Sequence, residues 1–535
     1  LRAHFNKLLA SSRTIPRVCL QEMALSKKTD VRKMWEVIPF ALDFKVYLFN
    51  YTNVDDIQKG AIPIVKEVGP FHFEEWKEKV EIEDHEDTDT VTYKRRDTFH
   101  FRPDLSGPGL TGDEMITMPH PLLFVSYTRV SRTNEQADSE DISKICLTWS
   151  LFDNPPTYFL TVKAIDILFN GVLVNCDKTE FAPKAVCTGL KKEAADSFII
   201  KPNNQLWFSL QSITLTFQRN GTINPHVITV QRGIRNVMDV GKVVAIDGKE
   251  EQDPWTGQCK LFEGTDATVF PPFLTENDRL ASFSTDLCRT FKPWYQKKTY
   301  YRGIATNRYI VNIGDFANDP DLQCYCSPPG SCPLKGLMDV EECVGVPFAV
   351  SLPHFYDADP SLHDGVKGLT PDVNEHEIYI DFEPISGTPM VAKQRVQFNV
   401  VLLKTDKIEQ CKELPNTLAP LFWIEEGLAL NKTFVNMLKY QLFIPKRVVG
   451  ILRWLMVSFC VFGILGGMVY HFKGEIIIHT NIINAKVCMS VCLSVCYLFI
   501  PGKDIRHFSS QKNTRFPRDK RVLAQRSCGR HLVEL

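Results

Sequence analysis

The sequence lacks the short motifs through which the common enzyme classes bind and activate their substrates. It contains no Gly-x-Ser-x-Gly, no His-Glu-x-x-His and no phosphate-binding loop. His354, in Ser-Leu-Pro-His-Phe, is a conceivable general base, but no nucleophile accompanies it. Asp357-Ala-Asp359 resembles the start of a calcium loop, which Pro360 then interrupts. We therefore predict that the protein is not an enzyme and has no catalytic residues, no metal site and no cofactor.

An excess of charge of either sign is also missing. The chain has 62 Lys and Arg residues against 63 Asp and Glu residues, a net charge of −1 over 535 residues. Domains that bind nucleic acid usually carry a marked basic excess, so we expect no nucleic acid partner. The length permits a large core and two or three domains, and 35 phenylalanines supply apolar surface to bury in it.

Zinc-type spacing is absent from the stretch that holds the densest group of cysteines. Structural zinc sites usually contain Cys-x-x-Cys pairs. Here the tightest pair is Cys324-x-Cys326, and no histidine lies between residues 288 and 343. Disulfides are therefore favoured over zinc, and the turn residues Ser-Pro-Pro-Gly-Ser make Cys332 a natural partner for Cys326. Spacing alone leaves fifteen pairings open for six cysteines. The six are Cys259, Cys288, Cys324, Cys326, Cys332 and Cys343.

Disulfides form in oxidising compartments, and other features of the sequence also indicate such a compartment. Cys176 and Cys187 frame a short loop and are a further candidate pair. Asn50, Asn220 and Asn431 each begin an Asn-x-Thr sequence that can accept an N-linked glycan. Because disulfides and N-glycans both belong to the secretory route, we predict that the body of the chain is extracellular.

One long apolar segment is present near the C-terminus. Residues 448–470 are interrupted by a single charge, Arg453, and a membrane span needs about 20 apolar residues. Trp454 and Tyr470 stand where interfacial anchors are usual. We therefore predict a transmembrane helix over residues 446–472.

The position of that helix divides the chain. We predict an extracellular body over residues 24–445 and a cytoplasmic, disordered tail over residues 473–535. Residues 1–23 are basic and contain no apolar run that would serve as a signal or an anchor. We interpret them as an aberrant N-terminus.

Alternating apolar residues predict strands through the extracellular body. Residues 44–49, 71–73, 91–101, 378–382 and 396–402 show this alternation, which is typical of antiparallel sheet with one buried face. The charged run 74–89 crosses two of the expected strands, and its simplest interpretation is a solvated face. With a few helical segments beside the strands, the fold class is α+β.

Several segments carry a family resemblance. They resemble the class B scavenger-receptor family and, within it, the branch of insect sensory neuron membrane proteins, similar to the type 1 form of moths. The segments include GTDATVFPPFL (264–274), STDLCRTF (284–291), CYC (324–326), SLPHF (351–355), residues 368–390, AKQRVQFNV (392–400), FALDFKVYLFNYTN (40–53) and residues 421–435.

The resemblance implies a structure for the extracellular body. It implies an antiparallel β-barrel core with a helical cap, placed between two membrane helices. It also implies one set of disulfides: Cys259–Cys324, Cys288–Cys343 and Cys326–Cys332.

The resemblance also implies a function. Family members bind lipids at the cap and pass them through an apolar tunnel to the bilayer. The sensory branch lies in the membrane of olfactory cilia and dendrites and assists the detection of long-chain, fatty-acid-derived pheromones. Its expected partners are an odorant receptor complex and a pheromone-binding protein. The alternative is a general scavenger or lipid-uptake receptor in non-neuronal tissue.

Three segments depart from the family pattern: residues 1–23, where its first membrane helix is expected, residues 123–157, where its cap is expected, and the tail from residue 473. We interpret all three as errors of the gene model or of splicing. Because the cap departs, the resemblance identifies no lipid-binding residue.

Overall fold

The computed structural model describes residues 22–123, 152, 155–177, 184, 187–188, 199–200, 205–210, 220–328, 330–404 and 411–473. The chain divides into two compact units, residues 1–432 and residues 433–535. The expected cap, residues 123–157, lies almost entirely outside the described residues. The same is true of residues 1–21 and of the tail from residue 474.

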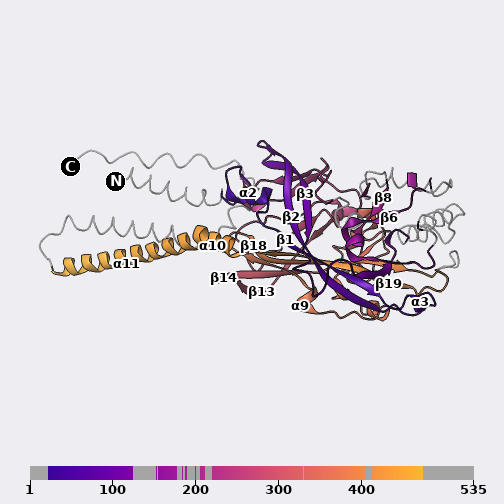
Figure 1. The fold of residues 1–535 in the computed structure, drawn as a ribbon. Helices are drawn as coiled ribbons and strands as arrows, with labels where there is room; N and C mark the ends of the chain where they lie inside the picture. Colours follow the sequence, from indigo (N-terminus) through magenta and orange to yellow (C-terminus); the bar gives the residue numbers. More distant parts are fainter. Residues whose placement is uncertain are drawn as a thin grey trace. The chain divides into compact units, whose positions relative to one another are not determined.

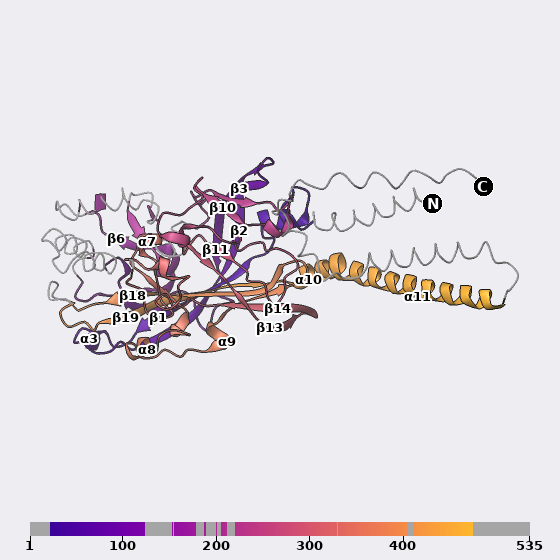
Figure 2. The same ribbon diagram turned by 180° about the vertical axis from the view of Figure 1, so that it is seen from behind.

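One large antiparallel sheet organises the first unit (Figures 1 and 2). In the described part of the chain it contains twelve strands, with β15 (Met338–Asp339) and β16 (Ala349–Ser351) attached beside β18. Along its main path the order is β10 (Val243–Ile246), β9 (Ile228–Gln231), β3 (Thr90–Phe101), β2 (Val65–His85), β1 (Leu42–Tyr51), β19 (Thr417–Ala429), β18 (Thr388–Leu402), β17 (Ile378–Glu383), β14 (Ile304–Val311) and β13 (Trp294–Tyr301).

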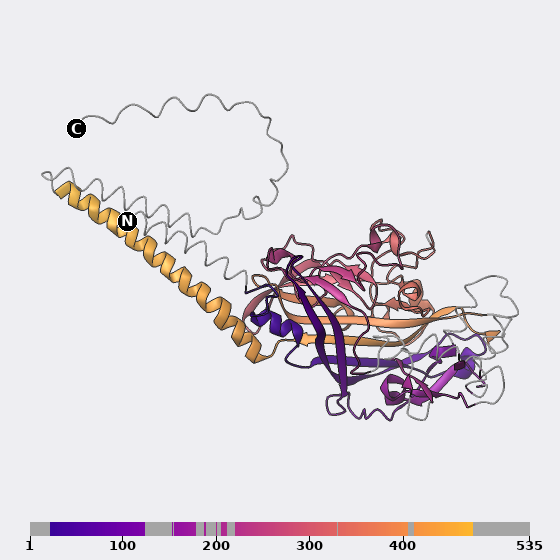
Figure 3. The same cartoon turned by 90° about the horizontal axis from the view of Figure 1, so that it is seen from above.

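The long strand β2 turns the sheet. Its first half pairs with β1, in a register that places Phe44 opposite Phe73. Its second half pairs with β3, apart from an isolated bridge between Val37 and Glu78. Figure 3 shows the indigo pair β2 and β3 running across the orange strands β18 and β19. The sheet is therefore strongly curved. In the described residues its end strands, β10 and β13, do not pair, so the expected closed barrel is wrong and the sheet is open.

Aromatic residues fill the concave core because alternate residues of a strand share one face. Phe44 packs edge-to-face on Phe99 with ring centroids 4.9 Å apart. Phe73 stacks on Phe169 at 4.3 Å. These rings come from β1, β2, β3 and the short helix η1 (Asp166–Asn170), so the expected period-two strands and their buried face are confirmed.

Short elements complete the first unit. Small sheets pair β4 (Met115–Pro119) with β5 (Phe159–Lys163), β11 (Ser282–Ser284) with β12 (Arg289–Phe291), and β8 (Leu206–Phe208) with β6 (Val172–Val174) and β7 (Ile199–Ile200). The helices are α2 (Asp30–Glu36), α3 (Val54–Ile57), η4 (Val237–Asp239), η5 (Gly257–Lys260), η6 (Gln323–Tyr325), α7 (Glu341–Val344), η7 (Pro353–Phe355), α8 (Ser361–Asp364) and α9 (Val373–His376).

The second unit is helical where it is described. Helix α10 (Lys432–Leu438) begins at the unit boundary and continues through η9 (Lys439–Phe443) into α11 (Ile444–Lys473). The stretch Lys432–Tyr470 has a mean hydropathy of 2.2 in its most apolar window, and none of that window is buried. In the described residues it is the one helix long and apolar enough to cross a membrane. Its apolar part coincides with the segment expected from the sequence.

Candidate ligand-binding site

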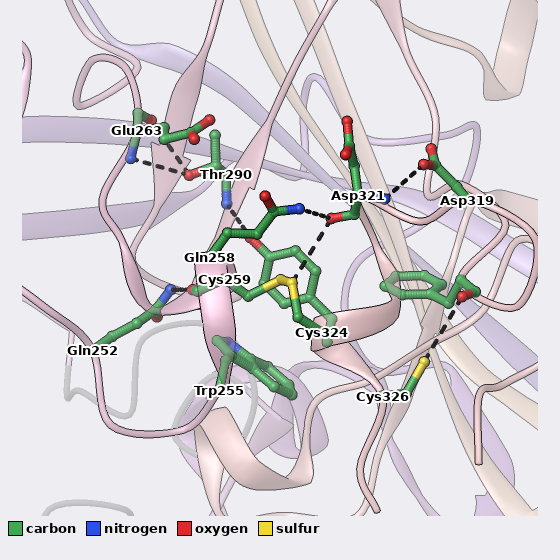
Figure 4. Close-up of a disulfide and its surroundings, with 12 residues drawn as sticks. Gln252, Trp255, Gln258, Cys259, Glu263, Thr290, Asp319, Asp321, Cys324 and Cys326 are labelled. Atoms are coloured by element: carbon green, nitrogen blue, oxygen red, sulfur yellow. Dashed lines mark hydrogen bonds between the residues drawn. A yellow bond between two sulfur atoms is a disulfide. The ribbon is translucent and has the colours of Figure 1, made fainter. Parts of the chain in front are cut away.

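The cysteines of the 259–343 stretch pair in the way that the resemblance implies. The structure contains the disulfides Cys259–Cys324, Cys288–Cys343 and Cys326–Cys332, and it also joins Cys176 to Cys187. Figure 4 shows the first of them beside the indole of Trp255. Trp255 Nε1 donates a hydrogen bond of 2.7 Å to the carbonyl of Cys288, which ties two of the bridges together. These bridges brace loops outside the large sheet.

The three glycan acceptors differ in accessibility. Asn220 and Asn431 are exposed, whereas Asn50 is half-buried within β1. Asn50 Oδ1 accepts the backbone N–H of Thr117 at 2.8 Å. Asn220 Oδ1 accepts the N–H of Phe99 at 2.7 Å, and its Nδ2 donates to the Phe99 carbonyl at 2.8 Å. Glycosylation at these positions stays a prediction.

His354 is buried in a network that fixes its ring. Its Nδ1 accepts the backbone N–H of Thr370 at 3.0 Å, so the proton of the neutral ring lies on Nε2, which donates to Glu67 Oε2 at 2.6 Å. The ring also stacks on His376 at 4.5 Å. Burial alone would raise the pKa of Glu67, but hydrogen bonds from His354 and Trp423 hold that pKa below its ordinary value. This histidine has a structural role, as the missing nucleophile suggested.

A cavity of about 270 Å³ on the concave side of the large sheet has the character of a ligand site. Strands β2, β3, β17, β18 and β19 contribute to its wall, together with α2, the loop around residues 266–270, β11 and the residues 285–287 that follow it. Most of its lining is apolar. Trp35, Leu42, Tyr93, Ile228, Val243, Phe270, Phe283, Phe291, Ile378, Ile380, Ala392, Val396 and Leu428 all contribute to it.

Charged side chains of β2 also face this cavity. Lys77 and Lys79 both line it, because residues two apart on a strand share a face. Lys77 Nζ lies 3.1 Å from Glu75 Oε1 and 3.2 Å from Glu426 Oε2. The interpretation of residues 74–89 as a solvated face is therefore wrong for this side of β2.

Of the carboxylates that oppose these cations, Glu75 lies on the same strand, whereas Glu426 and Asp286 come from distant parts of the chain. Burial and the nearby Glu426 raise the pKa of Glu75 well above its ordinary value. Burial would lower the pKa of Lys77, but Glu426 and Glu75 together raise it. On β3, Arg95 Nη2 lies 2.7 Å from Asp286 Oδ1, in the loop before β12. The inward charges are thus paired with one another, which makes their burial tolerable.

Comparison with known proteins decides the family. The family model described as "CD36 family" matches residues 8–471. The chain is 65% identical to "Sensory neuron membrane protein 1" of Ostrinia furnacalis over 457 residues, which is 85% of each chain. It is 64% identical to the protein of that name from Plutella xylostella over 456 residues, again 85% of each chain. With the Bombyx mori protein of that name the identity is 61% over 456 residues, 85% of this chain and 86% of the other.

The chain belongs to the CD36 family of class B scavenger receptors. Proteins of this family are membrane receptors and not enzymes, which confirms both the resemblance and the prediction of no catalytic activity. The candidate transmembrane helix and the disulfide-bonded body agree with a CD36-family receptor.

Sequence reasoning missed the charged wall of the cavity. The signal that would have found it is the pattern Glu75-x-Lys77-x-Lys79, which follows Phe71-x-Phe73 at the same period of two. When the inward positions of a strand change from apolar residues to charges of both signs at an unbroken period of two, the charged residues still face the interior. Such a pattern indicates paired charges inside the sheet rather than a solvated face.

Proposed function

We propose that this CD36-family protein is a membrane receptor of olfactory sensory neurons, where it captures fatty-acid-derived pheromones and delivers them through an apolar passage on the concave side of the sheet. The bilayer or an odorant receptor complex in the same membrane receives the ligand. A pheromone-binding protein is the proposed donor. The proposal rests on the apolar cavity in a chain so similar to proteins named for sensory neurons.

The energetics favour such a passage. Each methylene removed from water stabilises a fatty ligand by about 0.8 kcal/mol, so a long-chain acetate or aldehyde leaves a carrier for bulk water slowly. A continuous series of apolar contacts replaces that costly step. The cavity is smaller than the usual range of about 300–1,000 Å³ for ligand pockets, so it holds one end of a long chain rather than the whole ligand.

We also propose the membrane topology. Residues 24–445 lie outside the cell, with a helical cap over 123–157, and residues 473–535 lie in the cytoplasm. Glycosidase treatment of the full-length protein tests this arrangement, since glycans on Asn50, Asn220 or Asn431 place the body outside. Antibody labelling confined to gut or fat body, with none on pheromone-sensing neurons, would instead support a general lipid-uptake receptor.

Filling the cavity tests the ligand proposal. Ala392 lies on β18, is buried and lines the cavity. The phenyl ring of Ala392→Phe would occupy the part of the cavity that about two or three methylenes of the ligand fill. The variant should therefore bind a long-chain acetate about tenfold more weakly, or weaker still. The measurement is displacement of a fluorescent fatty-acid probe from the full chain in lipid nanodiscs.

The control is Ala305→Phe, on the exposed side of β14. It should bind the acetate as the unmodified protein does. Failure of the unmodified protein to release the probe at the solubility limit of the acetate contradicts the proposal. So does unchanged affinity in a folded Ala392→Phe variant.

A further inference from the structure

Lys79 stands out among the cations that line the cavity. Its Nζ donates hydrogen bonds to the Trp35 carbonyl at 2.9 Å and to Thr268 Oγ1 at 3.2 Å. The rings of Trp35 and Tyr93 lie 4.6 and 5.3 Å from the same nitrogen. An ammonium group has three N–H donors, so one remains without an acceptor among the described residues.

The other two cations of the cavity wall are neutralised by ion pairs, and Lys79 is not. Lys77 is paired with Glu75 and Glu426, and Arg95 is paired with Asp286. No carboxylate in the described part of the chain lies within ion-pair distance of Lys79.

The carboxylate with the strongest electrostatic effect on Lys79 is Asp266, and its oxygens are already occupied. Its Oδ2 accepts from Trp35 Nε1 at 3.1 Å and from the Tyr93 hydroxyl at 2.8 Å. Its Oδ1 accepts from the backbone and the hydroxyl of Thr268. Asp266 therefore organises the groups around Lys79 rather than pairing with it.

We propose that Lys79 is the anchor for the polar head of the fatty ligand, through a hydrogen bond from Nζ to a carbonyl or carboxylate oxygen. This inference rests on the proposed function. The head group enters the site walled by Trp35 and Tyr93, and the chain follows the apolar wall formed by residues such as Phe270 and Ile380. The ligand class is a long-chain molecule with one oxygen-bearing end: a carboxylate, an acetate ester or an aldehyde.

The protonation of Lys79 fits a selective anchor. Burial lowers its pKa to about 8; Asp266 and Asp97 oppose that effect, while Arg95 and Lys77 reinforce it. The group is therefore largely an ammonium at neutral pH and becomes neutral as pH rises above 8. Carboxylate binding should weaken over that range, because the neutral amine has lost both its charge and the third N–H donor that remains for the ligand.

The test measures four ligands of one chain length: a carboxylate, an aldehyde, an acetate and an alkane. Each displaces a fluorescent apolar probe from the full chain in nanodiscs. In Lys79→Met we expect the affinity for the carboxylate to fall about tenfold, the affinities for aldehyde and acetate to fall severalfold, and the alkane affinity to stay unchanged. Lys79→Gln keeps a donor without a charge, so it should lose carboxylate affinity and retain much of the acetate affinity.

The control is Lys66→Met, since Lys66 is an exposed residue of the same strand outside the cavity lining. An equal loss for the alkane would show that Lys79 only supports the wall, and unchanged carboxylate affinity in both Lys79 variants would refute the anchor. Failure of the proposed function gives a different result: the unmodified protein then binds none of the four ligands. In that case the anchor is rejected together with the proposed function. Thermal unfolding of each variant identifies a folding defect, and Lys79→Gln then decides the question.

Discussion

Glu425, on the convex side of β19, offers a test of how the sheet depends on buried charge. Its Oε1 lies 2.6 Å from Lys393 Nζ and 3.3 Å from Lys45 Nζ. Its Oε2 lies 2.7 Å from Arg395 Nη2. The side chain is only 6% exposed. Three strands, β1, β18 and β19, are therefore joined by one carboxylate.

The size of the effect follows from the carboxyl pKa. Burial alone would raise the pKa of Glu425, but Lys393, Arg395 and Lys45 lower it from the ordinary 4.5 to about 2. That difference corresponds to about 3 kcal/mol of stability. Because the pKa is depressed in the folded state, the contribution is complete above pH 4.5 and is lost as pH falls through 2. At pH 3 less than half of it remains.

Glu425→Gln keeps the shape of the side chain and removes its charge. At pH 7 we expect the variant to lose about 3 kcal/mol, the cost of leaving buried cations without their partner. Guanidinium denaturation of the full chain in detergent, followed by tryptophan fluorescence, measures the loss. The difference between the two proteins should shrink by more than half between pH 7 and pH 3.

The control is Glu413→Gln, which removes an exposed carboxylate 3.8 Å from Lys404. Exposed pairs contribute little, so this variant should unfold like the unmodified protein at every pH. A Glu425→Gln difference that stays constant down to pH 3, or that is absent at pH 7, would refute the reasoning.

Two further predictions concern the bridges and a helix cap. Replacing Cys288 and Cys343 by alanine opens a loop of 55 residues and should cost about 4 kcal/mol, whereas replacing Cys326 and Cys332 opens one of 6 residues and should cost about 2 kcal/mol. Equal shifts in guanidinium midpoints would contradict this order. Thr29 Oγ1 caps α2, so Thr29→Ala should cost about 1 kcal/mol in thermal unfolding and Thr29→Ser much less; equal losses would mean that the cap has no such role.

The sequence predicts those parts of the fold that depend on neighbours along the chain. Alternation in residues 396–402 correctly indicates a strand because each residue's face follows from the one before it. The apolar segment near Val448 indicates a helix of membrane-spanning length for a similar reason. The turn residues between Cys326 and Cys332 favour their disulfide, while the other bridges needed the family resemblance because spacing left their partners open.

Contacts between distant segments cannot be predicted from neighbouring residues along the chain. Lys77 and Glu426 are 349 residues apart, and only the pairing of β2 through β1 to β19 brings them together. The open edge of the sheet between β10 and β13 depends on the same long-range order. The period-two pattern of Glu75, Lys77 and Lys79 can indicate inward charges, but no local pattern identifies Glu426 as their partner. The barrel was implied by the family resemblance, and no local pattern tests it.

The two faces of β19 use charge in different ways. Glu425 and Glu426 are adjacent, so their side chains lie on opposite faces of the strand. On the convex side, Glu425 gathers three cations into a buried cluster, and Arg395 also donates to the carbonyls of Asn374 and Glu377. On the concave side, Glu426 pairs with Lys77 and leaves Lys79 without a carboxylate. The cluster around Glu425 pairs all of its charges within the sheet, which favours a rigid sheet. On the concave side, Lys79 has no carboxylate partner among the described residues and lies beside an apolar cavity, which favours a ligand with one polar end.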